Sequence, residues 1–249
     1  MSDRLGIVLA AGMGTRMKSD LPKVLFPVCG RPMIHFVLDA LTQAGVGRIL
    51  VVIGHRAEAV RAELANRPVE FVEQTERLGT GHAVKMCLPA MAEHQGSVVV
   101  LAGDSPLVQV SSLESLFNEF DRNRPACLLG TLHKDNPAGL GRIVRSNDGR
   151  FEGIVEEKDA TPLQREITEV NMSTYVFEAG ELRHALQQLR NENRQKEYYL
   201  TDCPGILLRE GKDVRALPVL KACESFSINT PDELQIVEAE MRKLGYPSY

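Results

Sequence analysis

The feature that most constrains this chain is a glycine-rich turn directly after a short apolar run. Residues 6–10 are apolar without polar alternation, which is typical of a parallel strand buried on both faces. The chain continues as Gly12-Met13-Gly14-Thr15-Arg16-Met17, and Leu21-Pro22-Lys23 follows one short loop later. Because glycine has no Cβ, a polyphosphate can lie against the main-chain N–H groups of such a turn. The pattern therefore predicts a strand that ends in a phosphate-binding turn.

Basic side chains accompany this turn. Arg16, Lys18 and Lys23 supply positive charge close to it, so the site suits a nucleoside triphosphate. The dinucleotide fingerprint is excluded because Met17 stands where its third glycine belongs, and no P-loop pattern occurs in the chain. Taken alone, the glycines are equally consistent with an ordinary strand end, and the basic side chains with a solvated loop.

Strand-like and helix-like segments alternate through the first half. Strands are expected at residues 49–53, 69–73 and 98–102, and helices at 31–41, 57–65, 81–92 and, from a capping box of Ser111 with Glu114, up to 120. This alternation predicts an α/β fold with a doubly wound, Rossmann-like sheet.

The second half adds an antiparallel patch. Strands at 142–144 and 151–155 flank the hairpin signal Asn147-Asp148-Gly149, and further strands are expected at 170–177 and 214–219. Helices are expected at 179–193, 203–210 and 231–244, the last capped by Thr230 with Glu233. Because the sequence shows no linker and no internal repeat, residues 1–249 are predicted to form a single domain with a mixed sheet.

Composition excludes several classes of partner. The net charge of -4, from 33 acidic and 29 basic residues, gives no basic field for nucleic acid and no polybasic stretch for a membrane. The five cysteines are widely spaced without a C-x-x-C pair, which favours buried thiols in a reducing compartment. The first apolar run is too short for a signal peptide. We expect a cytoplasmic protein, either a monomer or a small homo-oligomer.

Seven motifs in order carry a family resemblance. They are Leu9-Ala10-Ala11-Gly12-x-Gly14-Thr15-Arg16-Met17 with Leu21-Pro22-Lys23, Gln74 with LGTGHA at 78–83, GDSPL at 103–107, GLGRI at 139–143, GIVEEKDA at 153–160, EVN at 169–171 and EYYLTD at 197–202. Together they resemble the sugar-1-phosphate nucleotidylyltransferases. Within that family they are most similar to the uridylyltransferase half of the bifunctional UDP-N-acetylglucosamine pyrophosphorylase/glucosamine-1-phosphate acetyltransferases.

The resemblance implies roles on the nucleotide side. Leu9, Ala10, Ala11, Gly12 and Gly14 would bind the triphosphate of UTP, while Arg16 and Lys23 would be the catalytic cations. Gln74, Gly79, Thr80 and Gly81 would form the uracil pocket, and Asp104 and Asn229 would hold Mg²⁺. Without the resemblance, Asp104 is equally consistent with a turn residue, and Asn229 is more typical of one. His82 is then more typical of a helix start than of a catalytic base.

The resemblance also implies an acceptor site. Gly141, Glu156, Asn171 and Thr201 would hold the sugar 1-phosphate, although residues 156–159 alone read as a solvated turn. Three departures lie here: Ala102 replaces an aromatic residue, Leu140 a tyrosine, and Met172-Ser173 a Thr-Gly pair. They put the identity of the sugar in doubt.

The implied activity is magnesium-dependent formation of UDP-N-acetylglucosamine and pyrophosphate from UTP and N-acetylglucosamine 1-phosphate, within nucleotide-sugar biosynthesis for the cell envelope. One alternative is a nucleotidylyltransferase for another sugar or nucleotide. Another is a regulator that binds a nucleotide sugar without turnover. The bifunctional relatives continue into a β-helix acetyltransferase domain, and we expect none here because the chain ends at Tyr249 without hexapeptide repeats.

Overall fold

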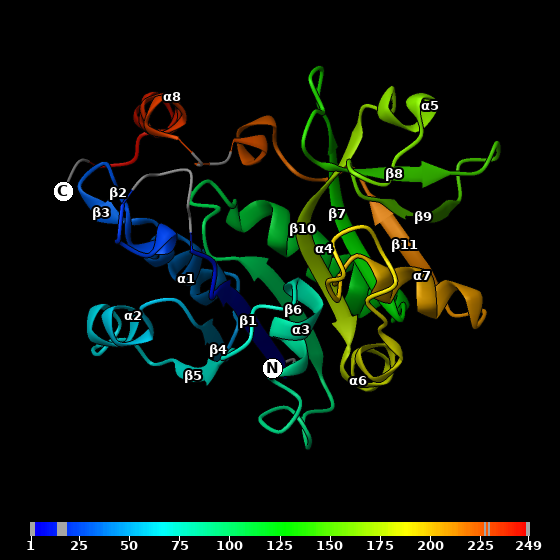
Figure 1. Ribbon diagram of the computed structural model, residues 1–249, viewed down its shortest axis with the longest axis horizontal. Coiled ribbons are helices and arrows are strands. Elements are labelled where there is room, and N and C mark those ends of the chain that lie inside the picture. The colour runs from blue at the N-terminus through cyan, green and yellow to red at the C-terminus, as the bar shows by residue number, and fades with distance from the viewer. Residues whose placement is uncertain (1–2, 14–18, 227, 229, 248–249) are drawn as a thin grey trace.

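The computed structural model describes residues 3–13, 19–226, 228 and 230–247. Its centre is a mixed sheet with the strand order β11-β7-β10-β6-β1-β4-β5, to which β8 and β9 are added beside β10 (Figure 1). The strands are β1 (Arg4–Ala10), β4 (Arg48–Ile53), β5 (Glu70–Glu73), β6 (Ser97–Ala102), β7 (Cys127–His133), β8 (Gly141–Arg145), β9 (Phe151–Val155), β10 (Glu169–Glu178) and β11 (Val214–Leu217). This confirms the α/β class and the mixed sheet.

Parallel pairing forms one side of the sheet. β1 pairs in parallel with β4 and β6, and β4 pairs in parallel with β5. The strands read as continuous apolar runs because helices cover both faces. Leu5 and Ile7 belong to one hydrophobic cluster, whereas Val8 and Ala10 belong to the other. The alternation along β1 therefore serves two cores, one on each face.

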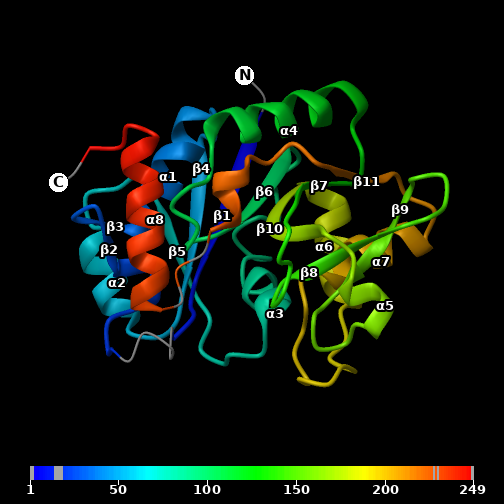
Figure 2. The same cartoon turned by 90° about the horizontal axis from the view of Figure 1, so that it is seen from above.

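Helices cover the two faces separately (Figure 2). α1 (Met33–Gln43), α2 (Ala57–Glu63) and α4 (Val110–Asn123) contribute to one cluster. α3 (Thr80–Lys85), α6 (Ala179–Gln188) and α7 (Asp202–Arg209) contribute to the other. α8 (Pro231–Lys243) packs beside the small sheet of β2 (Pro27–Val28) and β3 (Arg31–Pro32), and its predicted capping box of Thr230 with Glu233 is confirmed.

Antiparallel pairing forms the other side. β10 runs antiparallel to β6, β7 and β8, and β8 and β9 form the predicted hairpin, with Gly149 at φ +83° in its turn. Short α5 (Pro162–Arg165) lies next to this hairpin in Figure 1. The hairpin and α5 extend the sheet beyond its parallel part.

The sequence analysis missed β7, which is buried along nearly its whole length. A short apolar run does not distinguish a strand from part of a helix by periodicity, and Gly130 interrupts this one. A Cβ on Gly130 would lie only 2.9 Å from Leu220 Cδ2. Gly130 therefore packs closely against Leu220, whose side chain would have to shift to admit a Cβ.

Several predicted helix limits are wrong. Ser111 does not cap α4: the helix begins at Val110 after Gln109, whose N–H donates to Glu224 Oε1 at 3.1 Å. A carboxylate distant in sequence thus replaces the local cap. α1 begins two residues later than expected because residues 31–32 pair with β2, and α3 and α6 end at Lys85 and Gln188.

All five cysteines are free and buried, as expected. Burial raises the pKa of Cys87 to about 12, so this thiol stays protonated and packs as a small apolar group. In the part of the chain that the structure describes, no helix combines the length and the apolar character that crossing a membrane requires.

Candidate active site

Most of the predicted nucleotide-side residues gather at one edge of the sheet. Ala10 stands opposite Ile53, Leu9 opposite Ala102, and Ile53 opposite Glu73, so β1, β4, β5 and β6 end side by side. The carboxyl ends of parallel strands are where open α/β sheets bind ligands. The segments that leave these ends carry Gly12, Gln74 and Asp104.

Lys23 and Asp104 form an ion pair across this edge. Lys23 Nζ donates to Asp104 Oδ2, and the two side chains are 14% and 27% exposed. Lys23 opens the 3-10 helix Lys23–Leu25, whose Val24 and Leu25 are buried and so anchor the loop. Asp104 follows β6, and its other carboxylate oxygen accepts no hydrogen bond from the described residues. One oxygen ligand is therefore open to a cation.

The glycine-rich turn is described only at its beginning. Leu9 carbonyl accepts from Gly103 N at 2.9 Å, Ala11 carbonyl accepts from His55 N at 3.4 Å, and Ala10 is buried. Gly12 is exposed, and a Cβ there would meet no described atom within 4 Å. Glycine at this position thus leaves open space rather than relieving a clash. Gly14, Arg16 and Asn229 lie outside the described residues.

The amide of Gln74 is held in one orientation. Gln74 is 5% exposed, its Nε2 donates to Gly79 carbonyl at 3.0 Å, and the same nitrogen lies 3.1 Å from His82 Nδ1. A carbonyl only accepts, so the NH₂ group must face Gly79. Gln74 Oε1, to which no described residue donates, is left to accept from a ligand. This free oxygen suits a base that presents an N–H.

The turn beside Gln74 is tied to a distant segment. Gly81 N donates to Tyr198 carbonyl at 2.8 Å, and Leu200 N donates to Thr80 Oγ1 at 3.2 Å. Gly79 has φ +104°, and a Cβ there would lie 2.5 Å from Tyr198 carbonyl oxygen. Only glycine fits such an approach. The contacts join the predicted base-recognition turn to the segment that leads into Thr201.

A cleft of about 340 Å³ adjoins Gln74. It is lined by Gly54, His55, Arg56, Ala57, Glu73, Gln74, Thr75 and Arg77. A Cβ on Gly54 would lie 2.9 Å from Ala11 Cβ, so the two strand ends approach closely only because this residue is glycine. The cleft thus lies between the segments that follow β4 and β5.

On the acceptor side, Gly141 and Asn171 are paired across β8 and β10. A Cβ on Gly141 would lie 3.1 Å from Ile154 Cγ2 and 3.5 Å from Asn171 Cβ. Asn171 is 6% exposed. The two predicted sugar-binding residues are therefore direct neighbours in the sheet, and the small side chain keeps the surface beside Asn171 clear.

Glu156 and Thr201 form a second acceptor pair. Thr201 Oγ1 donates to Glu156 Oε1 at 2.9 Å. Burial raises the pKa of Glu156, the Thr201 hydrogen bond opposes that shift, and the charge of Asp159 adds to it. The Glu156 carboxyl is therefore partly desolvated, and hydrogen bonds from sugar hydroxyls to it are favourable.

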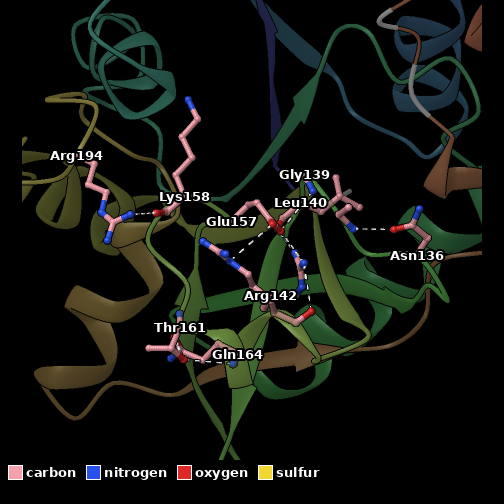
Figure 3. Close-up of polar contacts among 11 residues, drawn as sticks. Asn136, Gly139, Leu140, Arg142, Glu157, Lys158, Thr161, Gln164 and Arg194 are labelled. Atoms are coloured by element: carbon pink, nitrogen blue, oxygen red, sulfur yellow. Dashed lines mark hydrogen bonds and ion pairs between the residues drawn. The ribbon is translucent and has the colours of Figure 1, made fainter.

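Arg142 connects the turn at Gly139 and Leu140 with the loop that contains Glu157 (Figure 3). Arg142 is 1% exposed; its guanidinium donates to Glu157 Oε2 at 2.6 Å and to Leu140 carbonyl. Glu157 also accepts from Gly139 N at 3.4 Å. One buried cation thus fixes the glycine turn before Gly141 and the loop that contains Glu156. The sequence analysis did not identify this role, because the contact depends on tertiary structure.

A cavity of about 460 Å³ lies between β9, the end of α6 and α7. Thr201 and Asp202 line it, whereas Gly141, Glu156 and Asn171 do not. Burial, with the charge of Glu156, raises the pKa of Asp202 to about 6. Within the described ranges, no cluster of three or more His, Cys, Asp or Glu side chains could hold a metal ion.

Known proteins resemble this chain over most of its length. The model of the MobA-like NTP transferase domain matches residues 6–199. The bifunctional protein GlmU of Shouchella clausii is 43% identical over 98% of this chain and 53% of its own length. GlmU of Streptococcus suis is 42% identical over 98% of the chain and 53% of its own length, and that of Lactococcus lactis 42% over 97% and 52%. The chain spans about half the length of these relatives.

The mixed α/β fold is that of a nucleotide-sugar transferase-like domain. The chain belongs to the MobA-like NTP transferase family.

Proposed function

We propose that this chain is a uridylyltransferase that makes UDP-N-acetylglucosamine. A phosphate oxygen of N-acetylglucosamine 1-phosphate attacks the α-phosphorus of UTP in line. A new O–P bond forms, the bond from the α-phosphorus to the bridging oxygen breaks, and pyrophosphate leaves with that electron pair. The nucleophile is already an anion, so no general base is needed. The reaction belongs in the cytoplasm, where UTP is available and buried free thiols remain reduced.

The observation that carries this proposal is the Lys23–Asp104 pair at the carboxyl edge of β1 and β6. Phosphoryl transfer is accelerated mainly by positioning and by charge stabilisation. Lys23, with Arg16, would stabilise charge on the triphosphate and on the departing pyrophosphate. Gly12 and Gly14 would give the phosphates access to main-chain N–H groups, and Leu9, Ala10 and Ala11 would support that turn.

Mg²⁺ would be held by Asp104 and Asn229. Oxygen ligands suit this ion, and one oxygen of Asp104 is not occupied by a described residue. When bound, the ion supplies positive charge to the phosphates of UTP. Asp104 also orients Lys23, because the ion pair holds Nζ at the strand edge.

Base selection would rest on Gln74 and the turn Gly79-Thr80-Gly81. The fixed amide leaves Oε1 to accept from the N3–H of uracil, while cytosine offers an unprotonated nitrogen at this position. For the acceptor, Gly141, Glu156, Asn171 and Thr201 would bind the hydroxyl and acetamido groups of the sugar.

A different acceptor is favoured by one specific observation. Ala102 and Met172, two departures from the family pattern, line the same small cavity of about 10 Å³. Leu140, a third departure, packs with Met172 against the cluster of Leu132, Val170 and Leu220. These residues gather into one apolar patch beside Asn171. Another sugar 1-phosphate, or a nucleotide sugar bound without turnover, is thus the second candidate.

A pyrophosphate-release assay separates these possibilities. The purified chain would be given UTP with N-acetylglucosamine 1-phosphate, glucose 1-phosphate or no acceptor, and the product identified by its mass. We expect pyrophosphate and UDP-N-acetylglucosamine in equal amounts. If pyrophosphate is released only with another sugar phosphate, that sugar phosphate is the acceptor. No release with any acceptor, despite binding of UDP-N-acetylglucosamine, would favour the regulator.

A further inference from the structure

Tyr175 makes a buried contact with the predicted acceptor residue Asn171. Its hydroxyl accepts a hydrogen bond from Asn171 Nδ2 at 2.6 Å, and both residues are buried. The ring of Tyr175 stacks on Phe177 with their centroids 5.8 Å apart, which fixes its direction within β10. The sequence analysis gave Tyr175 no role.

A bulge in β10 makes this contact possible. Asn171 stands opposite Thr131 and Thr174 opposite Gly130, so Met172 and Ser173 have no partners in β7. In a regular strand, Asn171 and Tyr175 would be about 13 Å apart. Because of the two extra residues, they stand opposite positions only two residues apart in β7, about 7 Å along the strand. Both side chains therefore reach the same face as neighbours.

The bulge also fixes which way the amide points. Ser173 N donates to Asn171 Oδ1 at 3.2 Å, and Ser173 has φ +55°, a left-handed conformation that favours glycine. A peptide N–H only donates, so Oδ1 must face Ser173 and Nδ2 must face Tyr175. One N–H of Asn171 remains for a ligand, in a fixed direction.

We propose that Tyr175 is a positioning residue for the acceptor sugar, acting through Asn171. This inference rests on the proposed function, because it requires that Asn171 bind the sugar. The Tyr175 hydroxyl holds the amide so that its remaining N–H points at an oxygen of the acceptor. Burial, and more weakly the charge of Glu156, raise the pKa of Tyr175 well above its usual value, so the phenol stays neutral while it accepts.

The test is Tyr175→Phe, which removes only the hydroxyl. A neutral hydrogen bond contributes about 3- to 10-fold in an equilibrium constant. We expect KM for N-acetylglucosamine 1-phosphate to rise by about this factor while KM for UTP stays near wild-type. Because Asn171 Nδ2 loses its buried acceptor, the melting temperature falls, and both KM values are measured well below it. Tyr246→Phe is the matched control: its hydroxyl lies 3.4 Å from Gln109 Nε2, away from the acceptor residues, and it should leave both KM values unchanged.

A double-mutant cycle shows whether the hydroxyl acts through Asn171. In an Asn171→Ala background, Tyr175→Phe should have no further effect on KM for the sugar phosphate. The dissociation constant of UDP-N-acetylglucosamine, measured by calorimetry, should follow the same pattern without depending on turnover. The inference is overturned if Tyr175→Phe keeps wild-type affinity for the sugar phosphate, or if it weakens the binding of UTP as much as that of the sugar phosphate. It is also overturned if Tyr175→Phe retains its full effect in the Asn171→Ala background. If the wild-type chain uses a different acceptor, the proposed function is wrong, and the cycle is then run on that acceptor.

Discussion

The nucleotide and acceptor halves of this molecule handle charge in opposite ways. In the nucleotide half, formed by β1, β4, β5 and β6, the central contact joins opposite charges, Lys23 with Asp104. In the acceptor half, formed by β7–β10 and α7, Glu156 and Asp202 are like charges, and burial raises the pKa of both. The first arrangement offers a cation to phosphate, whereas the second offers hydrogen bonds to neutral hydroxyls.

The halves also differ in how their backbone builds the site. On the nucleotide side, parallel strands end in register, and the segments that follow them carry the site residues. On the acceptor side, the site depends on the bulge at Met172 and Ser173 and on the buried Arg142. Both halves thus rely on tertiary contacts, but the parallel half aligns its site residues at strand ends, whereas the antiparallel half aligns them by a bulge and a buried cation.

The contacts of residues 198–200 with the turn at 79–81 join the two halves. Thr80 accepts from Leu200, and the next residue, Thr201, donates to Glu156. The predicted base-recognition turn is therefore connected to the acceptor pair through only two residues, Leu200 and Thr201. The halves are distinct in chemistry but share this connection.

The largest expected effect is on the nucleotide side. Removing one preorganised charge donor from a transition state typically costs about 100- to 1,000-fold in rate. We expect Lys23→Ala to lose turnover by that order while remaining folded. Lys243→Ala, at an exposed ion pair with Glu240, is the control. Turnover of Lys23→Ala close to wild-type would remove Lys23 from the mechanism.

The next effect concerns the acceptor half. We expect N-acetylglucosamine 1-phosphate to be preferred over glucose 1-phosphate, but only by the roughly 10- to 200-fold typical of apolar contact, because Leu140 and Met172 form an apolar patch. Specificity constants from competition between the two sugar phosphates measure this. A preference for glucose 1-phosphate would overturn the acceptor assignment and leave the nucleotide side intact.

The third-largest expected effect is on the dependence of activity on Mg²⁺. Even groups outside the ligand shell cost about 10- to 100-fold in metal affinity when removed. Asp104→Asn should therefore raise the Mg²⁺ concentration for half-maximal activity by at least about tenfold, and a chelator should abolish wild-type activity. Asp135→Asn, at an exposed position, is the control. Activity that persists in excess chelator would show that the assignment of Asp104 is wrong.

The smallest effect is on stability. The pKa of Asp202 is raised to about 6 in the folded chain, so the folded state binds the proton more tightly than the unfolded state does. The stabilising contribution of protonated Asp202 to the free energy of unfolding is fully present below about pH 4 and is lost as the pH rises through about 6. Because the residue has an exposed surface, water limits the effect to below about 1 kcal/mol.

Asp202→Asn should remove the loss of stability that accompanies deprotonation of Asp202. In urea unfolding, the variant should gain stability relative to wild-type between pH 4 and pH 7. A difference that is constant across this range would exclude Asp202 as its source.

The elements that the sequence predicts well are those whose signals are local. Apolar runs, the Gly149 hairpin and the capping box of Thr230 with Glu233 each act within a few residues, and the structure confirms them. β7 was missed because its apolar run is short and Gly130 interrupts it. The predicted cap at Ser111 failed because Glu224, more than a hundred residues away, occupies that helix end.

The candidate site follows the same rule. Lys23, Asp104 and Gln74 could be named from motifs, since each lies in a motif that follows a predicted strand. The contacts of Arg142 and Tyr175 could not be predicted, because they arise only in the tertiary structure and at the bulge in β10. Ser173 is a signal that could have been used: a Ser in place of Gly beside Asn171 indicates a strained turn there.

The most direct test of the division between the halves is a crossed specificity measurement. Gln74→Ala and Asn171→Ala would each be assayed with UTP against CTP, and with N-acetylglucosamine 1-phosphate against glucose 1-phosphate. We predict that Gln74→Ala lowers only the UTP preference and that Asn171→Ala lowers only the sugar preference. If either variant changes both ratios equally, the two halves do not select their substrates separately, and the account is contradicted.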